Sequence, residues 1–372
     1  MTLKEELEIL RGAPIKTFDG DPLSIPCIET SDVVQLCKHP VVSVHMLAYN
    51  HEPYIRQAIE SVMAQKTDFE FELVIGEDCS KDKTRDICFE YQKRFPDKIR
   101  VLWWHENVTK YGGNERRVTV HCRGEFIAFC EGDDYWIDPL KLQKQVDVMR
   151  QYKKVHLCFC DSKGYYQERK ELADTWWGED WGNSHVISGA DFCTGQKRLI
   201  TCSAMIRTNI VRCSYQRYEI FKWQLFLGDL QIWIAMNSFG DSFYINEKMA
   251  VYRIHQEGVT KRNWSKFLRD LKIVEAYYSR LGILTDAIGK SARLDLGIAL
   301  CGDLSQYNKV ISRERARYML STPVIRNCLS WWMRFFLKYV SVWGYSEWFY
   351  KFAKNTSHGY GWIFRSLMLR VR

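Results

Sequence analysis

The chain has 372 residues, of which 46% are hydrophobic and 26% are charged. This length is enough to bury a large core, and this composition excludes a disordered, collagen-like or coiled-coil protein. No apolar run reaches the roughly eighteen residues that a membrane-spanning helix needs. The 13 cysteines include no CxxC pair, and the first residues form no apolar signal segment. We therefore expect free thiols in a reducing cytoplasm.

The positive charge is concentrated in the last third of the chain. The formal net charge is +8, but from residue 261 onward 20 Lys and Arg stand against 7 Asp and Glu. Residues 323–372 hold 8 basic residues, one acid and 14 aromatic residues. Such a segment suits an anionic membrane surface, because its rings lie at the headgroup level and its cations meet lipid phosphates. The alternative is that the segment forms a helical cap packed on the main domain. Nucleic acid is disfavoured as a partner of this segment, because the sequence contains no recognised nucleic-acid-binding module.

Strands and helices alternate along the chain after a leader. Residues 1–40 begin with a short helix and continue as a loop rich in Gly and Pro. A helix is expected over 52–65, and Ser80 caps another. Apolar runs predict strands at 41–48, 71–75, 99–103 and 125–130. This order is typical of an α/β protein with a parallel sheet and helices on both faces, which binds ligands beyond the carboxyl ends of its strands.

Acidic residues gather at these strand ends. The second strand runs into residues 77–80 (Glu-Asp-Cys-Ser), and the fourth runs into residues 131–134 (Glu-Gly-Asp-Asp). The first strand runs into residues 49–51 (Tyr-Asn-His) at the same edge. Crowded carboxylates usually hold a cation or manage protons. A hard divalent ion shared with a diphosphate is the ligand that this pattern indicates.

Five motifs in order resemble those of a known enzyme family. They are VVSVHMLAYNHEPYIRQAIESVMAQ (41–65), ELVIGEDCSKDKT (72–84), GEFIAFCEGDDYWIDPLKLQKQ (124–145), the pair Gly228-Asp229, and VYRIHQEGVT (251–260). Together they resemble the family 2 glycosyltransferases, which transfer sugars from nucleotide donors on the GT-A fold. The resemblance covers roughly residues 40–260 and leaves out the leader and the C-terminal segment.

The resemblance implies a donor pocket at the strand ends. Asp78 matches the carboxylate that accepts a hydrogen bond from uracil, and Tyr49 lines the same nucleotide pocket. Asp133 is expected against the ribose or the donor sugar. Glu131 replaces the usual leading Asp of the motif, which leaves its role open. The residues expected to bind the donor are Tyr49, Asn50, Asp78, Glu131, Asp133 and Arg117.

The resemblance also implies a metal site, a base and an acceptor side. Asp134 and His255 are expected to hold Mn²⁺ or Mg²⁺. Asp229 matches the catalytic base, although an Asp at the start of a helix is first of all a cap. One base opposite the leaving group gives direct displacement with inversion. The residues expected to contact the acceptor are Trp177, Trp181, Thr201 and Cys202.

The resulting prediction is an α/β protein: a GT-A nucleotide-binding sheet with flanking helices and a mainly helical aromatic and basic C-terminal extension. Residues 41–260 form the catalytic domain, with a nucleotide-binding half (41–135) and an acceptor half (136–260). Residues 261–372 form a helical region.

The expected activity is inverting transfer of a sugar from a UDP-linked donor to a saccharide or lipid-linked saccharide in bacterial polysaccharide biosynthesis. The expected place is the cytoplasm, at the inner face of the cell membrane. The alternatives are an inactive carbohydrate-binding or scaffold protein of this fold and a sugar nucleotidyltransferase. A nucleotidyltransferase usually has a Gly-rich, basic phosphate loop after its first strand, whereas this chain has Tyr-Asn-His-Glu.

Overall fold

The structure is a computed structural model of the chain. It describes residues 4–5, 7–8, 14–17, 25–111, 113–174, 182–193, 199–225, 228–256, 258, 270, 273–274 and 277–284. The expected acceptor residues Trp177 and Trp181 lie outside the described residues, and so do most of the region 261–372 and much of the leader 1–40.

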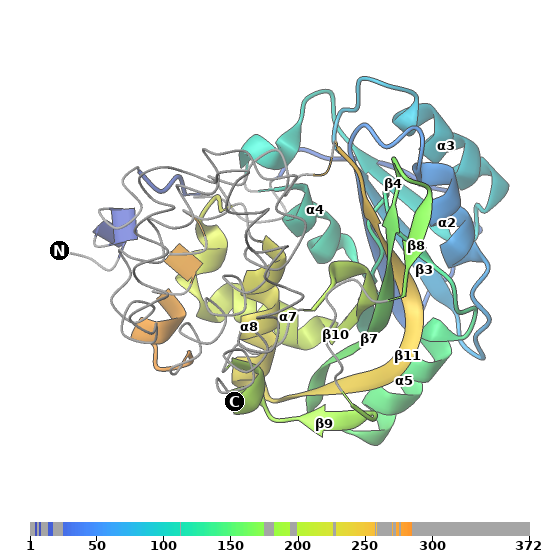
Figure 1. The fold of residues 1–372 in the computed structure, drawn as a ribbon. Coiled ribbons are helices and arrows are strands. Elements are labelled where there is room, and N and C mark those ends of the chain that lie inside the picture. The colour runs from blue at the N-terminus through green and yellow to red at the C-terminus, as the bar shows by residue number, and fades with distance from the viewer. Residues whose placement is uncertain are drawn as a thin grey trace, which may run out of the picture.

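The described residues form one mixed sheet of eleven strands (Figure 1). The main order is β1-β4-β3-β2-β5-β10-β7-β11-β6, with β8 paired to β7 and β9 paired to β11. The strands are β1 (Ile28–Thr30), β2 (Val42–Ala48), β3 (Phe71–Glu77), β4 (Ile99–Trp103), β5 (Phe126–Phe129), β6 (Tyr135–Trp136), β7 (Val155–Tyr166), β8 (Glu171–Ala173), β9 (His185–Ile187), β10 (Ala204–Arg207) and β11 (Asp241–Ile254).

Helices cover both faces of this sheet (Figure 1). Apolar side chains of α2, α3 and α5 pack on one face, and those of α4, α7 and α8 pack on the other, so the core has two layers. The helices are α2 (Ile55–Met63), α3 (Thr84–Arg94), α4 (Asn114–His121), α5 (Lys141–Gln151), α6 (Gly189–Cys193), α7 (Thr208–Arg217) and α8 (Gly228–Phe239), with short 3₁₀ turns η2 (Val108–Tyr111), η3 (Thr201–Ser203) and η4 (Glu219–Lys222).

The first half of the sheet is parallel, as the sequence predicts. Strands β4, β3, β2 and β5 lie side by side in the same direction. All seven residues of β3 are buried, because helices cover both faces of the strand. The expected strands at 41–48, 71–75, 99–103 and 125–130 correspond to β2 through β5. The carboxyl ends of these strands therefore meet at one edge, where the acidic motifs lie.

The second half of the sheet is mixed rather than parallel. Strand β10 runs antiparallel to both β5 and β7, and β6 runs antiparallel to β11. The long strand β11 pairs with β7 in parallel, with register shifts between Ile245 and Ala250. Because β6 directly follows the acidic loop and pairs with β11, the far end of β11 is brought next to that loop. The predicted α/β class with flanking helices is confirmed.

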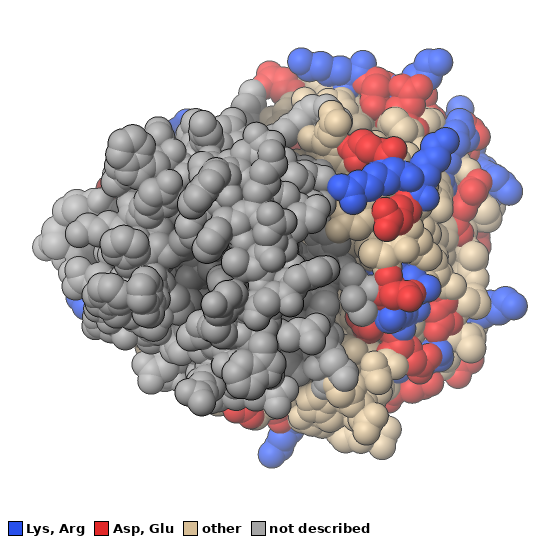
Figure 2. All heavy atoms as spheres, in the orientation of Figure 1, with Lys and Arg blue, Asp and Glu red and all other residues tan. Residues whose placement is uncertain are grey.

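The surface of the described part carries both signs of charge. On the face seen in Figure 2, basic and acidic side chains are interspersed. The basic excess of the sequence falls in residues 261–372, most of which the structure does not describe. Among the described helices, none has the length and apolar character needed to cross a membrane.

Candidate active site

The loops that follow β2 and β3 are joined by reciprocal hydrogen bonds. The Asn50 backbone N–H donates to Ser80 Oγ at 3.0 Å, and the Lys81 N–H donates to Asn50 Oδ1 at 2.8 Å. The His51 N–H donates to Thr84 Oγ1 at 2.8 Å. Asn50 adopts a left-handed backbone with φ of 55°, a conformation that Asn tolerates well. Asn50 therefore joins the two loops at this edge of the sheet, and its neighbour Tyr49 is 42% exposed.

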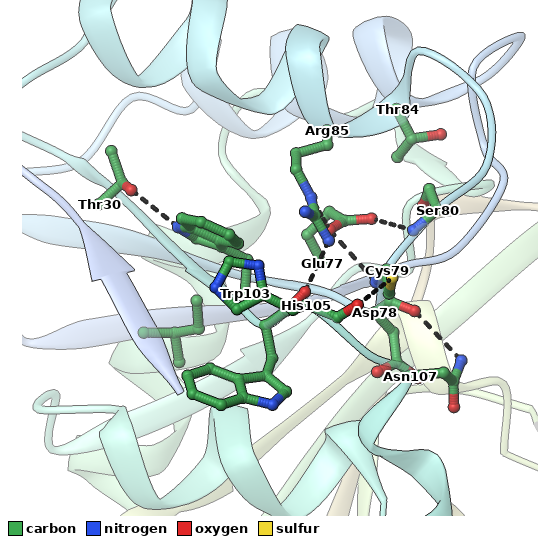
Figure 3. Close-up of polar contacts among 12 residues, drawn as sticks. Thr30, Glu77, Asp78, Cys79, Ser80, Thr84, Arg85, Trp103, His105 and Asn107 are labelled. Carbon is green, nitrogen blue, oxygen red and sulfur yellow. Dashed lines mark hydrogen bonds and ion pairs between the residues drawn. The ribbon is translucent and has the colours of Figure 1, made fainter. Parts of the chain in front are cut away.

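Asp78 is held by the loop that follows β4. Its carboxylate accepts hydrogen bonds from the Val108 backbone N–H and the Thr109 hydroxyl, both at 2.6 Å. Asn107 donates its side-chain amide to the Asp78 carbonyl oxygen at 3.1 Å (Figure 3). Each carboxylate oxygen has two acceptor sites. The carboxylate is thus fixed in place and can still accept a further hydrogen bond from a ligand.

The preceding residue, Glu77, shapes the same loop from the interior. Its carboxylate accepts the Ser80 backbone N–H at 2.6 Å and forms an ion pair with Arg85 (Figure 3). The Arg85 guanidinium lies 4.9 Å from the Trp103 ring centre and donates to the Trp104 carbonyl oxygen. These contacts hold the loop in a turn rather than leaving Glu77 free to contact a ligand.

Arg117 lies beneath this edge and is fully buried. One terminal nitrogen donates to the carbonyl oxygens of Glu77 and Leu102 and to Asn114 Oδ1. Its Nε and its other terminal nitrogen have no partner among the described residues. Burial lowers the pKa of Arg117, and the charge of Asp78 opposes this effect. Arg117 thus supports the ends of β3 and β4, and donor binding by Arg117 stays a prediction.

Asp133 lies between two histidines. Its Oδ2 is 3.0 Å from His255 Nε2 and 3.7 Å from His51 Nε2. Burial alone would raise the pKa of Asp133, but the two imidazoles outweigh it and hold the pKa below its usual range. A Cβ on Gly132 would lie 2.7 Å from His51 Nδ1, so only glycine leaves room for this ring. The pairing of His255 with Asp133 is a contact that the sequence did not predict.

Asp134 points away from these histidines. It is 2% exposed, its Oδ1 accepts the Arg253 backbone N–H at 2.8 Å, and it bonds to the Cys202 thiol. Burial, followed by repulsion from Asp133, raises the pKa of Asp134 well above its usual range. Cys202 is itself fully buried and accepts the Trp136 indole N–H at its carbonyl oxygen. The Cys202 side chain therefore packs under the acidic loop and does not line the expected acceptor surface.

Arg253 fastens the acidic loop to the end of β11. Its Nε donates to the Asp133 carbonyl oxygen at 2.7 Å, and its terminal nitrogens donate to Gln167 Oε1 and Gln57 Oε1. The guanidinium also lies 5.0 to 5.3 Å from the ring centres of three tyrosines: Tyr54, Tyr135 and Tyr165. Because its donors are used inside the protein, Arg253 positions the loop.

Asp229 lies in the first turn of α8. Its Oδ1 accepts the Leu230 backbone N–H at 2.7 Å, and its Oδ2 accepts the Thr201 hydroxyl at 3.0 Å. Burial raises the pKa of Asp229, and repulsion from Glu115 raises it further. Burial also raises the pKa of Glu131 well above its usual range, with neighbouring carboxylates, Asp229 among them, adding to the effect.

Two further residues belong to this site and were missed from the sequence. His51 stands at a predicted strand end, which was a usable signal for it. Glu115 lies in the first turn of α4 and bonds to Tyr215, which is 100 positions away in the chain. No local pattern marks such a contact, so only the structure reveals it.

Two of these residues suit a divalent cation. The described residues contain no group of three or more His, Cys, Asp or Glu arranged to hold a metal ion. His255 Nε2 and Asp133 Oδ2 nevertheless lie 3.0 Å apart, so an imidazole nitrogen and a carboxylate oxygen are directed at the same place. Cations at diphosphate sites are often held by only one or two protein ligands, with phosphates completing the shell. The residues present therefore fit Mn²⁺ or Mg²⁺.

Comparison with known proteins finds a family that this part of the chain resembles. Residues 43–213 match the family model described as glycosyl transferase family 2. This part of the chain is thus similar to the family 2 glycosyltransferases. The matched range includes the loops with Asp78 and Asp133, whereas Asp229 and His255 lie beyond it.

Relatives and solved structures agree with this resemblance. An uncharacterised protein of Mycobacterium tuberculosis is 30% identical over 227 residues, covering 59% of this chain and 60% of that protein. The chain thus spans 60% of that relative's length. WfaP of Escherichia coli is 26% identical, in an alignment that covers 63% of this chain and 86% of WfaP. WfaP is described as a UDP-Glc:alpha-D-GlcNAc-diphosphoundecaprenol beta-1,3-glucosyltransferase. S. aureus TarS (residues 1–349) has the same fold, with a TM-score of 0.57 at 15% identity over 80% of this chain and 86% of that structure.

We predict that Arg253→Lys destabilises the protein. An ammonium group cannot reach the Asp133 carbonyl oxygen and both glutamines at once, so buried acceptors lose their partners. The free energy of unfolding should fall by about 2–4 kcal/mol, measured by urea denaturation. Arg56→Lys is the matched control, because Arg56 forms an exposed pair with Glu90 and should leave stability nearly unchanged. Equal stability of the Arg253 variant and the wild type would contradict this role.

Proposed function

We propose that this protein is a glycosyltransferase that moves a sugar from a UDP-linked donor to a hydroxyl of a saccharide acceptor. The observation that carries the proposal is the meeting of three groups at one sheet edge within or beside the family 2 domain. They are the fixed carboxylate of Asp78, the Asp133–His255 pair, and Asp229 at the start of α8. These are the parts that donor binding, leaving-group stabilisation and proton removal require.

The nucleotide is proposed to bind along the joined loops after β2 and β3. Asp78, rigidly held by Val108 and Thr109, would accept a hydrogen bond from the base, and the exposed ring of Tyr49 would lie against it. A UDP donor is supported by the activity named for WfaP and by the TarS structures solved with UDP and UDP-GlcNAc.

Asp133 and His255 are proposed to hold a divalent cation, Mn²⁺ or Mg²⁺. This replaces the expected pairing of His255 with Asp134, because Asp134 is turned inward to Arg253 and Cys202. When bound, such a cation acts as a Lewis acid that offsets the charge of the departing diphosphate. Glu131 lies on the same loop, and the charge of Asp229 contributes to raising the pKa of Glu131, after burial and the two aspartates of the loop.

Asp229 is proposed as the base that takes the proton of the attacking hydroxyl. Its carboxylate is fixed by Leu230 and Thr201, and each oxygen keeps a lone pair for the acceptor. A raised pKa makes the ionised carboxylate a stronger base. A single base opposite the leaving diphosphate gives inversion at the anomeric carbon. Thr201 then lies on the acceptor side, and the acceptor is proposed to be a saccharide, lipid-linked as in the name of WfaP.

We predict that Asp229→Asn lowers sugar transfer by roughly 10²–10⁴-fold, because the amide cannot take the proton. The donors would be UDP-Glc and UDP-GlcNAc, with UDP release as the readout and UDP affinity expected to stay unchanged. Asp147→Asn, on the exposed side of α5, is the matched control and should keep full activity. Undiminished turnover in the Asp229 variant would remove it from the mechanism, and binding without turnover in the wild type would favour an inactive carbohydrate-binding protein.

The basic aromatic segment 323–372 is proposed to bring the enzyme to an anionic membrane surface, where lipid-linked acceptors are presented. Its 8 basic residues against one acid support this. The full chain should sediment with vesicles containing anionic lipid, and raised salt should weaken this binding because it screens the charges. Failure to bind anionic vesicles at low salt would leave packing on the domain as the explanation of the segment.

A further inference from the structure

Glu115 is held rigidly beside the candidate active site. It lies in the first turn of α4, and its Oε1 accepts hydrogen bonds from the Tyr215 hydroxyl at 2.7 Å and the Thr119 hydroxyl at 2.9 Å. Burial, and then the charge of Glu115, raise the pKa of Tyr215 well above its usual range. Tyr215 therefore stays protonated and donates to a charged carboxylate.

The other oxygen of Glu115 is turned toward α8. A Cβ on Gly228 would lie 3.9 Å from Glu115 Oε2 and 4.0 Å from Glu115 Cγ. Gly228 is the residue directly before Asp229. The Glu115 carboxylate is thus held at the amino end of α8, beside the residue that precedes the proposed base.

We propose that Glu115 is a positioning residue for Asp229: with Oε1 tied to Tyr215 and Thr119, its Oε2 faces the amino end of α8 and strengthens Asp229 as a base. The proposal rests on the proposed function, in which Asp229 removes the acceptor proton.

Electrostatics at the helix start explains why such a residue is useful. The amino end of a helix carries a partial positive charge and favours an ionised carboxylate, which would make Asp229 a weak base. Burial is the main cause of the raised pKa of Asp229, and the like charge of Glu115 adds to it and so opposes the effect of the helix end. The other polar and charged groups around Glu115 and Asp229 are Glu131, the Thr201 hydroxyl, Arg116 and His45. The Nε2 atom of His45 lies 3.1 Å from the Glu115 carbonyl oxygen.

The test is a direct titration of Asp229 in the full chain. Aspartate labelled with ¹³C at the side-chain carboxyl group is incorporated, and the Asp229 signal is assigned by its loss in Asp229→Asn. Glu115→Gln keeps the shape of the side chain and removes its charge. We expect the pKa of Asp229 to fall by about one unit in this variant. The acid limb of the pH profile for UDP release from UDP-GlcNAc should move to lower pH by the same amount.

Two controls separate this role from a structural one. Glu125→Gln removes a charge from an exposed position at the start of β5 and should leave the Asp229 titration in place. Tyr215→Phe keeps the Glu115 charge and should keep the Asp229 pKa raised. An unchanged Asp229 titration in a folded Glu115→Gln protein would overturn the proposal. If the wild type releases no UDP, the proposed function fails, while the titration still decides the inference.

Discussion

The site depends on one buried guanidinium. Arg253 joins the end of β11 to the acidic loop through its own backbone N–H, its side-chain nitrogens and three tyrosine rings. Unpaired burial of a guanidinium is costly, so the surrounding acceptors must stay in place for the fold to be stable. The same contacts keep Asp134 buried and leave the Asp133 carboxylate partly exposed beside the two histidines. Stability and site geometry are therefore set by the same interaction.

This constraint gives the neighbouring carboxylates different environments. Asp134 is enclosed by Arg253 and Cys202, whereas Asp133 is flanked by two imidazoles that favour its ionised form. Asp229 stands apart at a helix start, where burial and Glu115 favour the protonated form. Groups whose pKa values are pushed in opposite directions are suited to opposite tasks. In the proposed mechanism, Asp133 binds a cation and Asp229 accepts a proton.

Much of the fold was predictable, because it follows from apolar runs and their order. Strands β2 to β5 lie where the sequence predicted them, and the rim that collects Asp78 and Asp133 follows from their parallel direction. Which of two adjacent aspartates faces the pocket was not predictable, since it depends on Arg253, 120 positions away. Glu115 was hidden for the same reason, as its partner Tyr215 comes from another helix. Long-range side-chain contacts leave no periodic signal in a single sequence.

The most direct test of the account is calorimetric titration of UDP with and without Mn²⁺. The wild type and the variant Asp133→Asn are compared, since Asp133 is the proposed cation ligand that faces the pocket. We predict that Mn²⁺ strengthens UDP binding to the wild type and that the variant loses most of this gain, roughly tenfold or more in affinity. UDP binding that is equally metal-dependent in Asp133→Asn, or indifferent to Mn²⁺ in the wild type, would contradict it.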